Sequence, residues 1–411
     1  MKILRPLLAL LVVSHFASAD DPAVTPGRKP PAKIVERVRP AIEAGRKALL
    51  AKDAAAVRAA AAQATAALGA WAGNPETATT HFTPIERAPF DAAKVRQVWL
   101  REVERGSRGV VWRKNPGGDP KVMEAGLREA AIPLAALART VPLAPEQAKA
   151  LTQLTREGAD WLLARQHSGG GFPMPVGPAL HPREKVGYLM ERMLKEHPDL
   201  VVDGWIPDDR GDGGLQFDNG LCGTALVEAW ELTHDDRYLA GARRAGDWAS
   251  AQPMVANWNY NAFSAGLLGR LARATGERKY LDSAVEKARV GVLPGQMKSG
   301  RWFDAHNACA AYHNILLRDL LEVFAALPES HDFRAELRDA LVRGLDQAAG
   351  ETVAQGFTGH WTANFARALV LLGENAKWRE ALNVCVNAAL TGKARSLGPD
   401  AVRVLELGPP R

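Results

Sequence analysis

Cysteine is scarce in this chain, and the three that are present, Cys222, Cys309 and Cys385, form no C-x-x-C motif. The absence of that motif leaves a zinc-finger or thioredoxin-like interpretation without support. Cys222 and Cys309 lie near the starts of two equivalent predicted helices. They either pair in a disulfide, which an oxidising compartment would permit, or are small buried residues of the core.

Long apolar runs are absent beyond the first twenty residues. Residues 1–19 combine a basic start, an apolar stretch and the A-x-A sequence Ala17-Ser18-Ala19, which predicts a secretory signal peptide. The apolar stretch is shorter than the about 20 residues that span a bilayer. We therefore expect an exported protein, periplasmic or secreted, with no membrane span.

Runs of Lys and Arg interleaved with aromatic residues are also absent, so nucleic acid is not an expected partner. The net charge is +6, and removal of Lys2 and Arg5 with the signal peptide leaves +4. That mild excess suits an acidic polymer as ligand, although it also serves solubility alone.

Alternation of apolar and polar residues between turn signals is almost absent, so strands are expected to be minor. Residues 217–239 instead resemble residues 259–281 at an offset of 42. The offset pairs Asn219 with Asn261 and Tyr238 with Tyr280. Each copy is a helix, a short polar turn and a second helix, which is typical of an α-hairpin repeat.

Further hairpins are predicted along the chain, about six to seven in all, which form an open solenoid or a closed ring. Gly-rich and aromatic loops recur at the starts of the inner helices, and this pattern favours a closed α/α toroid with one functional mouth. We expect a Pro-rich leader at 20–33, an N-terminal helical segment at 34–140 that completes or caps the ring, and toroid repeats at 141–411.

The first candidate site is RWFDAHNACAAYHN, residues 301–314. If one helix starts near Asp304, His306 and His313 are two turns apart on one face. With Asn307 and Tyr312 they would supply the base, the acid and the carboxylate-neutralising group that β-elimination on a uronic acid requires. The alternative is that these residues cap the helix or lie as satisfied polar groups in the core.

The second candidate is an acidic loop that contains Asp203, Asp208, Asp209, Asp212 and Asp218. Paired carboxylates of this kind serve glycosidases, and clustered oxygens bind calcium. The loop lacks the spacing of an EF-hand, and no other cofactor is expected. Asp218 starts an inner helix, so it is either catalytic or a helix cap.

The third candidate is a set of side chains at the loops of the mouth, where sugar rings stack on aromatic faces. About half of the aromatic residues are expected in the core instead. The substrate-binding set comprises Asn219, Trp258, Asn261, Arg301, Trp302, His360 and Trp361.

The sequence ADWLLARQHSGGGFP, followed about forty residues later by QFDNG, resembles the α/α-toroid pectate lyases, within the six-hairpin carbohydrate-active proteins. In that family Trp stands where this chain has Phe172, and the family's Arg-rich C-terminal stretch has no match here, so no catalytic arginine is carried over. The same pattern of a helix followed by Gln, Gly and an aromatic residue also resembles the repeat of terpene cyclases, but the acidic motif of that family is absent here. The predicted helix at 301–314 is faintly similar to glucuronyl epimerases. The positions that match the lyases are Leu162, Leu163, Gln166, Gly170, Gly171, Phe172, Pro173, Phe217, Asp218 and Asn219.

Together these observations predict an exported toroid that acts on an acidic polysaccharide or oligosaccharide, with a lyase as the leading hypothesis. A glycoside hydrolase using Asp218 is the second hypothesis. A non-catalytic repeat protein that binds glycan or protein is the third.

Overall fold

The computed structural model describes residues 30–74, 85–124, 126–180, 194–355, 361–392 and 402–407. The expected signal peptide and most of the expected leader lie outside these residues. The first helix, α1, begins at Ala32, inside the segment expected to be leader. Among the residues described, no helix is both long enough and apolar enough to cross a bilayer.

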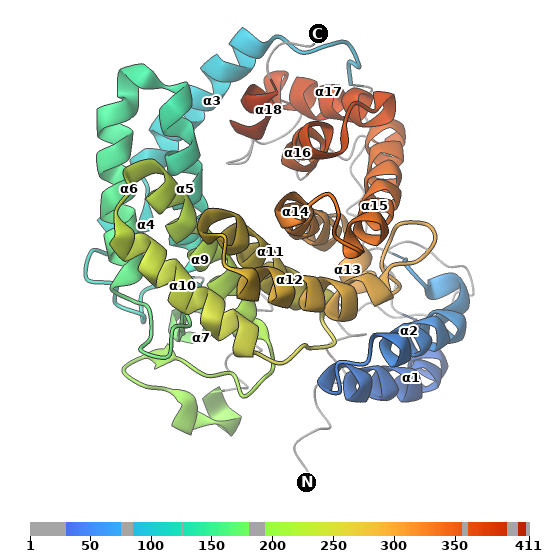
Figure 1. The fold of residues 1–411 in the computed structure, drawn as a ribbon. Coiled ribbons are helices and arrows are strands. Elements are labelled where there is room, and N and C mark those ends of the chain that lie inside the picture. The colour runs from blue at the N-terminus through green and yellow to red at the C-terminus, as the bar shows by residue number, and fades with distance from the viewer. Residues whose placement is uncertain are drawn as a thin grey trace.

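The described chain forms an all-α ring in two layers, which confirms the predicted α/α toroid (Figure 1). Successive inner helices pack against one another around the ring, and each outer helix packs on the inner helix that precedes it. The inner helices are α5 (Arg128–Thr140), α9 (Gly214–Thr233), α11 (Trp258–Thr275), α14 (Ala310–Ala326) and α16 (Thr362–Leu372). Their outer partners are α6 (Ala148–Leu163), α10 (Asp236–Ala251), α12 (Arg278–Gly291), α15 (Phe333–Gln355) and α17 (Ala376–Leu390).

Two helices that are distant in sequence close the ring. The short α18 (Val402–Glu406) packs against α16 and α5, and α3 (Ala92–Ser107) packs against α17, α18 and α5. Asp91 caps α3 by accepting hydrogen bonds from the backbone of residues 93 and 94. The sixth sector of the described ring is thus built from both ends of the chain.

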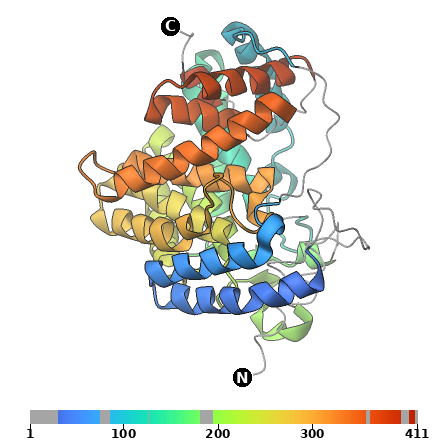
Figure 2. The same cartoon turned by 90° about the vertical axis from the view of Figure 1, so that its right-hand side faces the viewer.

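The hairpin of α1 (Ala32–Leu50) and α2 (Ala54–Leu68) lies outside the ring, along its edge near α12 (Figure 2). Asp53 caps α2 by accepting a hydrogen bond from the Ala56 amide. Lys52 pairs with Glu286 of α12 at 2.7 Å, and the Gly73 amide donates to the Phe303 carbonyl. The segment expected at 34–140 therefore contributes both to the ring and to a hairpin beside it.

Strands are minor, as predicted: β1 (Met174–Pro175) and β2 (Trp205–Ile206) form one short antiparallel pair among the described residues. Short helices α4 (Val111–Lys114), α7 (Gly177–Leu180) and α13 (Ala305–Ala308) lie in the connections.

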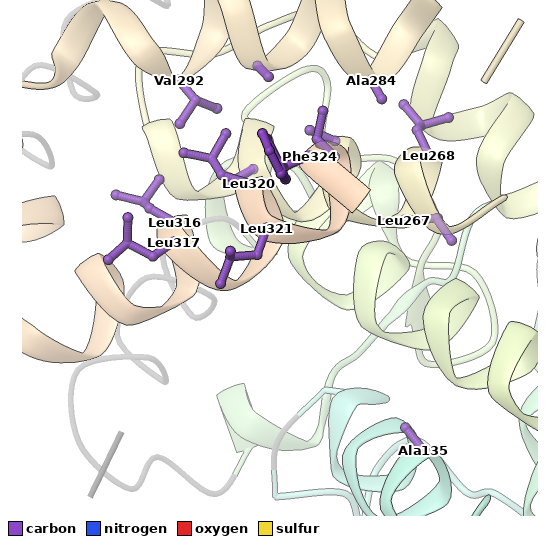
Figure 3. Packing of buried hydrophobic residues seen from close by; sticks show 14 of the residues in the cluster. Ala135, Leu267, Leu268, Ala284, Val292, Leu316, Leu317, Leu320, Leu321 and Phe324 are labelled. Carbon is purple, nitrogen blue, oxygen red and sulfur yellow. The ribbon is translucent and has the colours of Figure 1, made fainter. Parts of the chain in front are cut away.

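The core lies between the two layers, where inner and outer helices present apolar faces to each other. Figure 3 shows part of it, with leucines of α14, Phe324, and Leu267 and Leu268 of α11 in one cluster of buried side chains. Leu316, Leu317, Leu320 and Leu321 are each fully buried. Full burial of one such side chain stabilises the fold by about 1.5–3 kcal/mol.

Equivalent residues of the two repeat copies make equivalent bonds. The hydroxyl of Tyr238 in α10 donates to the Arg156 carbonyl of α6, the preceding outer helix. The hydroxyl of Tyr280 in α12 donates to the Arg243 carbonyl of α10, which again is the preceding outer helix. Both tyrosines are fully buried. Each repeat is therefore joined to the one before it by a hydrogen bond of the same kind.

Asn219 and Asn261 are the asparagines that the offset of 42 pairs, and both tie an inner helix to its outer partner. Asn219 Nδ2 donates to the Ala245 carbonyl at 3.0 Å, and Asn261 Nδ2 donates to the Gly291 carbonyl at 2.7 Å. Asn261 also exchanges two hydrogen bonds with the Val255 backbone. Both side chains are fully buried, so they support the ring itself.

Replacing Asn261 with alanine is expected to lower the free energy of unfolding by about 2–4 kcal/mol, because each buried group left unpaired costs about 1–3 kcal/mol. Chemical denaturation monitored by circular dichroism measures the change. Gln153→Ala, which removes an exposed amide from α6, should change the free energy of unfolding by about 0.5 kcal/mol or less. Equal stability in the two variants would contradict this role for Asn261.

Candidate functional site

The candidate site lies where α9, α11, α13 and α14 begin, at one end of the ring. Tyr260 is in the first turn of α11, His306 is in α13 and Tyr312 is in the first turn of α14. The rings of His306 and Tyr312 lie 3.9 Å apart between centroids, inclined at 33°. All three side chains are half-buried, so part of each is accessible to solvent. His306 and Tyr312 are thus in ring contact, and Tyr260 lies near enough to interact electrostatically with Tyr312.

Burial raises the pKa of Tyr260, and the neighbouring Asp212 carboxylate raises it further. Tyr312 and Asp209 add to the same effect, and Arg128 opposes it. Tyr260 therefore remains protonated at neutral pH, which makes its hydroxyl a proton donor rather than a base.

An asparagine network fixes the position of His306. Asp304 caps α13 by accepting bonds from the backbone amide and side-chain Nδ2 of Asn307, each at 2.9 Å. Asn307 Oδ1 accepts from Asn259 Nδ2 at 3.0 Å, and Asn259 Nδ2 lies 3.2 Å from His306 Nε2. Asn259 Nδ2 also donates to Asn257 Oδ1 at 2.7 Å, so Asn257 and Asn307 use both of its N–H groups and His306 Nε2 lies against this network.

Two arginines flank a pair of stacked phenylalanines. Phe217 of α9 and Phe263 of α11 lie 4.2 Å apart between centroids. The Arg128 guanidinium lies 4.7 Å above Phe217, and the Arg318 guanidinium lies 5.1 Å from Phe263. Since Phe263 is three residues after Tyr260 on α11, this group lies about one helical turn deeper than the tyrosine.

Each arginine is held by a buried carboxylate. Asp218 is fully buried and accepts bonds from the Arg128 amide at 2.9 Å and from Nη1 at 2.8 Å. Asp319 binds Arg318 through both of its oxygens, at 3.0 and 2.9 Å. The arginine side chains keep 21% and 28% of their surface exposed, so they can still meet an anionic group from solvent. Asp218 therefore orients Arg128 and does not itself face a ligand.

The carboxylates of the acidic loop do not gather at one site. Burial raises the pKa of Asp209, whose oxygens accept bonds from the Gly211 amide at 3.1 Å and the Leu215 amide at 2.8 Å. Among the described residues, no group of three or more His, Cys, Asp or Glu side chains is placed to hold a metal ion. Calcium binding thus has no preformed set of ligands in this part of the chain.

The expectation that His306 and His313 share one helix face is wrong. The chain is extended at Cys309, with φ −65° and ψ 151°, so α13 ends before α14 begins. His313 is fully buried, its ring edge-on to Trp302 at 5.5 Å and to Trp361 at 5.2 Å. Burial lowers the pKa of His313 well below its usual value, and Arg301 lowers it further, so it is a neutral core residue.

The remaining residues of the expected binding set lie in the core. Trp258 donates to Asp304 Oδ2 at 3.0 Å, and Trp302 donates to the Val292 carbonyl at 3.0 Å. Arg301 is buried and pairs with Glu351. Trp361 is 1% exposed, and His360 lies outside the described residues. Stacking of sugar on these three tryptophans would require the surrounding helices to separate.

Cys222, Cys309 and Cys385 take part in no disulfide. Cys222 and Cys385 are buried and Cys309 is half-buried, so the disulfide considered between Cys222 and Cys309 is not formed. The buried-core alternative agrees with Cys222 and Cys385.

Sequence reasoning missed Arg128, Arg318 and Asn259. Arg128 lies 90 residues before its partner Asp218, and Arg318 lies within a run of buried leucines. Asn259 was visible only as part of an aromatic loop. The signal that could have found Arg318 is its charge inside an otherwise apolar stretch next to Asp319.

No family model and no curated protein matches this sequence. Among solved structures, a glycosyl hydrolase family 88 protein from Bacteroides vulgatus is 13% identical, with 70% of this chain and 84% of that chain covered and a TM-score of 0.45. A polysaccharide lyase is 12% identical, with 72% of this chain and 83% of the lyase chain covered and a TM-score of 0.46. The GH76A α-1,6-mannanase from Salegentibacter sp. is 12% identical, with 72% and 98% covered and a TM-score of 0.32. At these values none of the three supports an argument about the reaction or substrate of this chain.

Proposed function

We propose that this protein is an exported enzyme that cleaves an acidic, uronate-containing polysaccharide by β-elimination. The carrying observation is the His306–Tyr312 pair beside Tyr260, at the end of the ring where Arg128 and Arg318 remain partly exposed. Base, acid and cation are the three groups that this elimination needs.

The assignment of roles follows from the surroundings of each group. The arginines neutralise the C6 carboxylate of the uronate, which acidifies the adjacent C5 proton. The imidazole of His306 removes that proton, and the C5 electron pair forms the C4=C5 double bond as the C4–O bond breaks. Tyr260, kept protonated by burial, or Tyr312 donates a proton to the leaving oxygen. Atoms and charge balance without any co-reactant.

A glycoside hydrolase is the alternative, but it cannot use Asp218 as first supposed, since that carboxylate is buried against Arg128. Hydrolysis would depend on Asp212, which is half-buried near Tyr260. A protein that binds glycan without cleaving it is the third alternative. In that case the His306–Tyr312 pair would serve only as a contact surface.

The mature protein should be incubated with a panel of uronate polymers while the ultraviolet absorbance of the new C4=C5 bond is recorded. A rise in absorbance with matching new chain ends is the expected result. New reducing ends without that absorbance would replace elimination by hydrolysis. Silence in both assays, with binding retained, would assign the protein to the glycan-binding class.

A further inference from the structure

At the end of the ring opposite the candidate site, the later turns of the inner helices bring charged side chains together. Glu228 of α9 accepts a hydrogen bond from Arg139 Nε at 2.9 Å and also pairs with Arg270. Glu322 of α14 pairs with Arg273 at 2.9 Å and with Arg367 at 3.2 Å. This arginine–glutamate cluster lies inside the ring, between α5, α9, α11, α14 and α16.

The buried part of the cluster has more cations than anions. Glu228, Glu322 and Arg270 are each about 6% exposed in their side chains. Arg139, Arg367 and Arg403 are 10–15% exposed, and Arg273 is one-third exposed. Glu228 and Glu322 therefore lie among five guanidinium groups. Asp319 is also buried close to Glu322 and Arg270, but it pairs with Arg318. Glu231 and Glu406 are exposed to solvent.

A cavity of about 320 Å³ opens on this cluster. The cavity is lined by four arginines and three glutamates: Arg139, Arg270, Arg273, Arg403, Glu228, Glu231 and Glu406. Pro142, Leu143 and Leu232 complete it. The volume is at the lower end of small-molecule sites, which run from about 300 to 1,000 Å³. It would accommodate an organic acid.

Several arginines of the cluster have N–H groups that do not donate to the glutamates. Arg273 binds Glu322 through Nη1. Arg403 binds Glu406 through Nη1, and its Nη2 is 3.8 Å from Glu322 and 4.0 Å from Glu228, which is beyond hydrogen-bond range. Each guanidinium carries five donors in a planar fork that matches a carboxylate. The remaining donors point to an anionic acceptor in the cavity.

We propose that this cavity binds a small organic anion with two or more carboxylate groups. The ligand adds negative charge where the buried cluster lacks it, and its carboxylates accept from the forks of Arg273 and Arg403. The cavity is lined by none of the residues of the candidate site, so its occupancy does not depend on the proposed reaction.

Titration calorimetry with citrate tests the proposal. We expect saturable binding to the wild-type protein and affinity at least tenfold weaker for Arg273→Ala, which loses one charge-assisted contact. Arg243→Ala, which removes an exposed arginine of α10 paired with Glu277, should bind citrate as the wild type does. Glucose, a neutral compound of similar size, should give no heat beyond dilution.

Absence of citrate binding, or equal affinity in Arg273→Ala and the wild type, would overturn the proposal. The cluster would then serve only to hold the inner helices together. Should Arg273→Ala fail to fold, Arg273→Lys keeps the charge but loses the planar fork, and weaker binding is again expected. His306→Ala should bind citrate normally, so a failed elimination assay and a failed citrate titration are separate results.

Discussion

His306→Ala is expected to lower kcat/KM on the responsive uronate polymer by about 10²–10⁴-fold, the usual contribution of a general base. Tyr312→Phe keeps the ring that stacks on His306 and removes only the hydroxyl. Tyr260→Phe likewise removes the proton donor whose pKa is raised by burial. We expect at least one of the two phenylalanine variants to lose activity to a similar degree. The initial rate of double-bond formation measures all three.

The control for these variants is His234→Asn, at the opposite end of α9. His234 is exposed and has φ +51°, a left-handed conformation that asparagine tolerates. It should retain wild-type activity. Full activity in His306→Ala and in both phenylalanine variants would remove the proposed acid and base from the reaction. Circular dichroism would show whether each variant is folded.

Arg270→Met is expected to lower the free energy of unfolding by about 1.5–3 kcal/mol, the usual contribution of a hydrogen bond to a charged group, because Arg139, Arg273 and Arg367 still pair with the two carboxylates. Arg270 is shared by Glu228 and Glu322, so both carboxylates lose a partner at once. Denaturation in urea at neutral pH measures the loss. Arg243→Met, in an exposed pair, should cost about 1 kcal/mol or less.

The same cluster gives the wild-type protein a defined acid sensitivity. Burial alone would raise the pKa of Glu228, but Arg139 and Arg270 outweigh it and lower that pKa from 4.5 to about 2. A carboxyl whose pKa is lower in the folded state stabilises the fold above its unfolded pKa and loses that contribution as pH falls. Wild-type stability should therefore fall between about pH 4.5 and pH 2, and Arg270→Met should fall less steeply there. Parallel slopes would contradict the pairing.

The ring was predictable because its signal is repeated. Asn219 and Asn261 recur at a fixed offset because each must reach a carbonyl on the outer helix beside it. Tyr238 and Tyr280 recur for the same reason. A requirement that every repeat must meet appears in the sequence more than once, and so it stands out without any structure.

The site was only partly predictable because it is formed by single contacts. His306 and Tyr312 were both named in one candidate segment, and the structure places their rings in contact. His313 was placed with them by helical spacing, which fails because one extended residue, Cys309, resets the helix phase. The partnership of Arg128 with Asp218 spans two separate helices, and no local pattern reports such a pair.

The tryptophans show a second reason why the site was only partly predictable from the sequence. Trp258, Trp302 and Trp361 occur near the starts of the inner helices, which is where exposed sugar platforms would also occur. Their indoles are buried, and those of Trp258 and Trp302 donate hydrogen bonds to Asp304 and to the Val292 carbonyl. Sequence position gives the loop, but which side of the loop an indole faces is decided by tertiary packing.

Closure of the ring by α3 and α18 has a consequence for the order in which the protein folds. About 300 residues separate these two helices, so their contact is among the last that a growing chain can make, and loop closure over such distances is slow. The central hairpins, α9 to α15, are built from contacts between neighbours in sequence and can form first as an open arc. Until α18 reaches α3 and α5, that arc has two uncovered ends, and a second unfinished copy could pair with either of them.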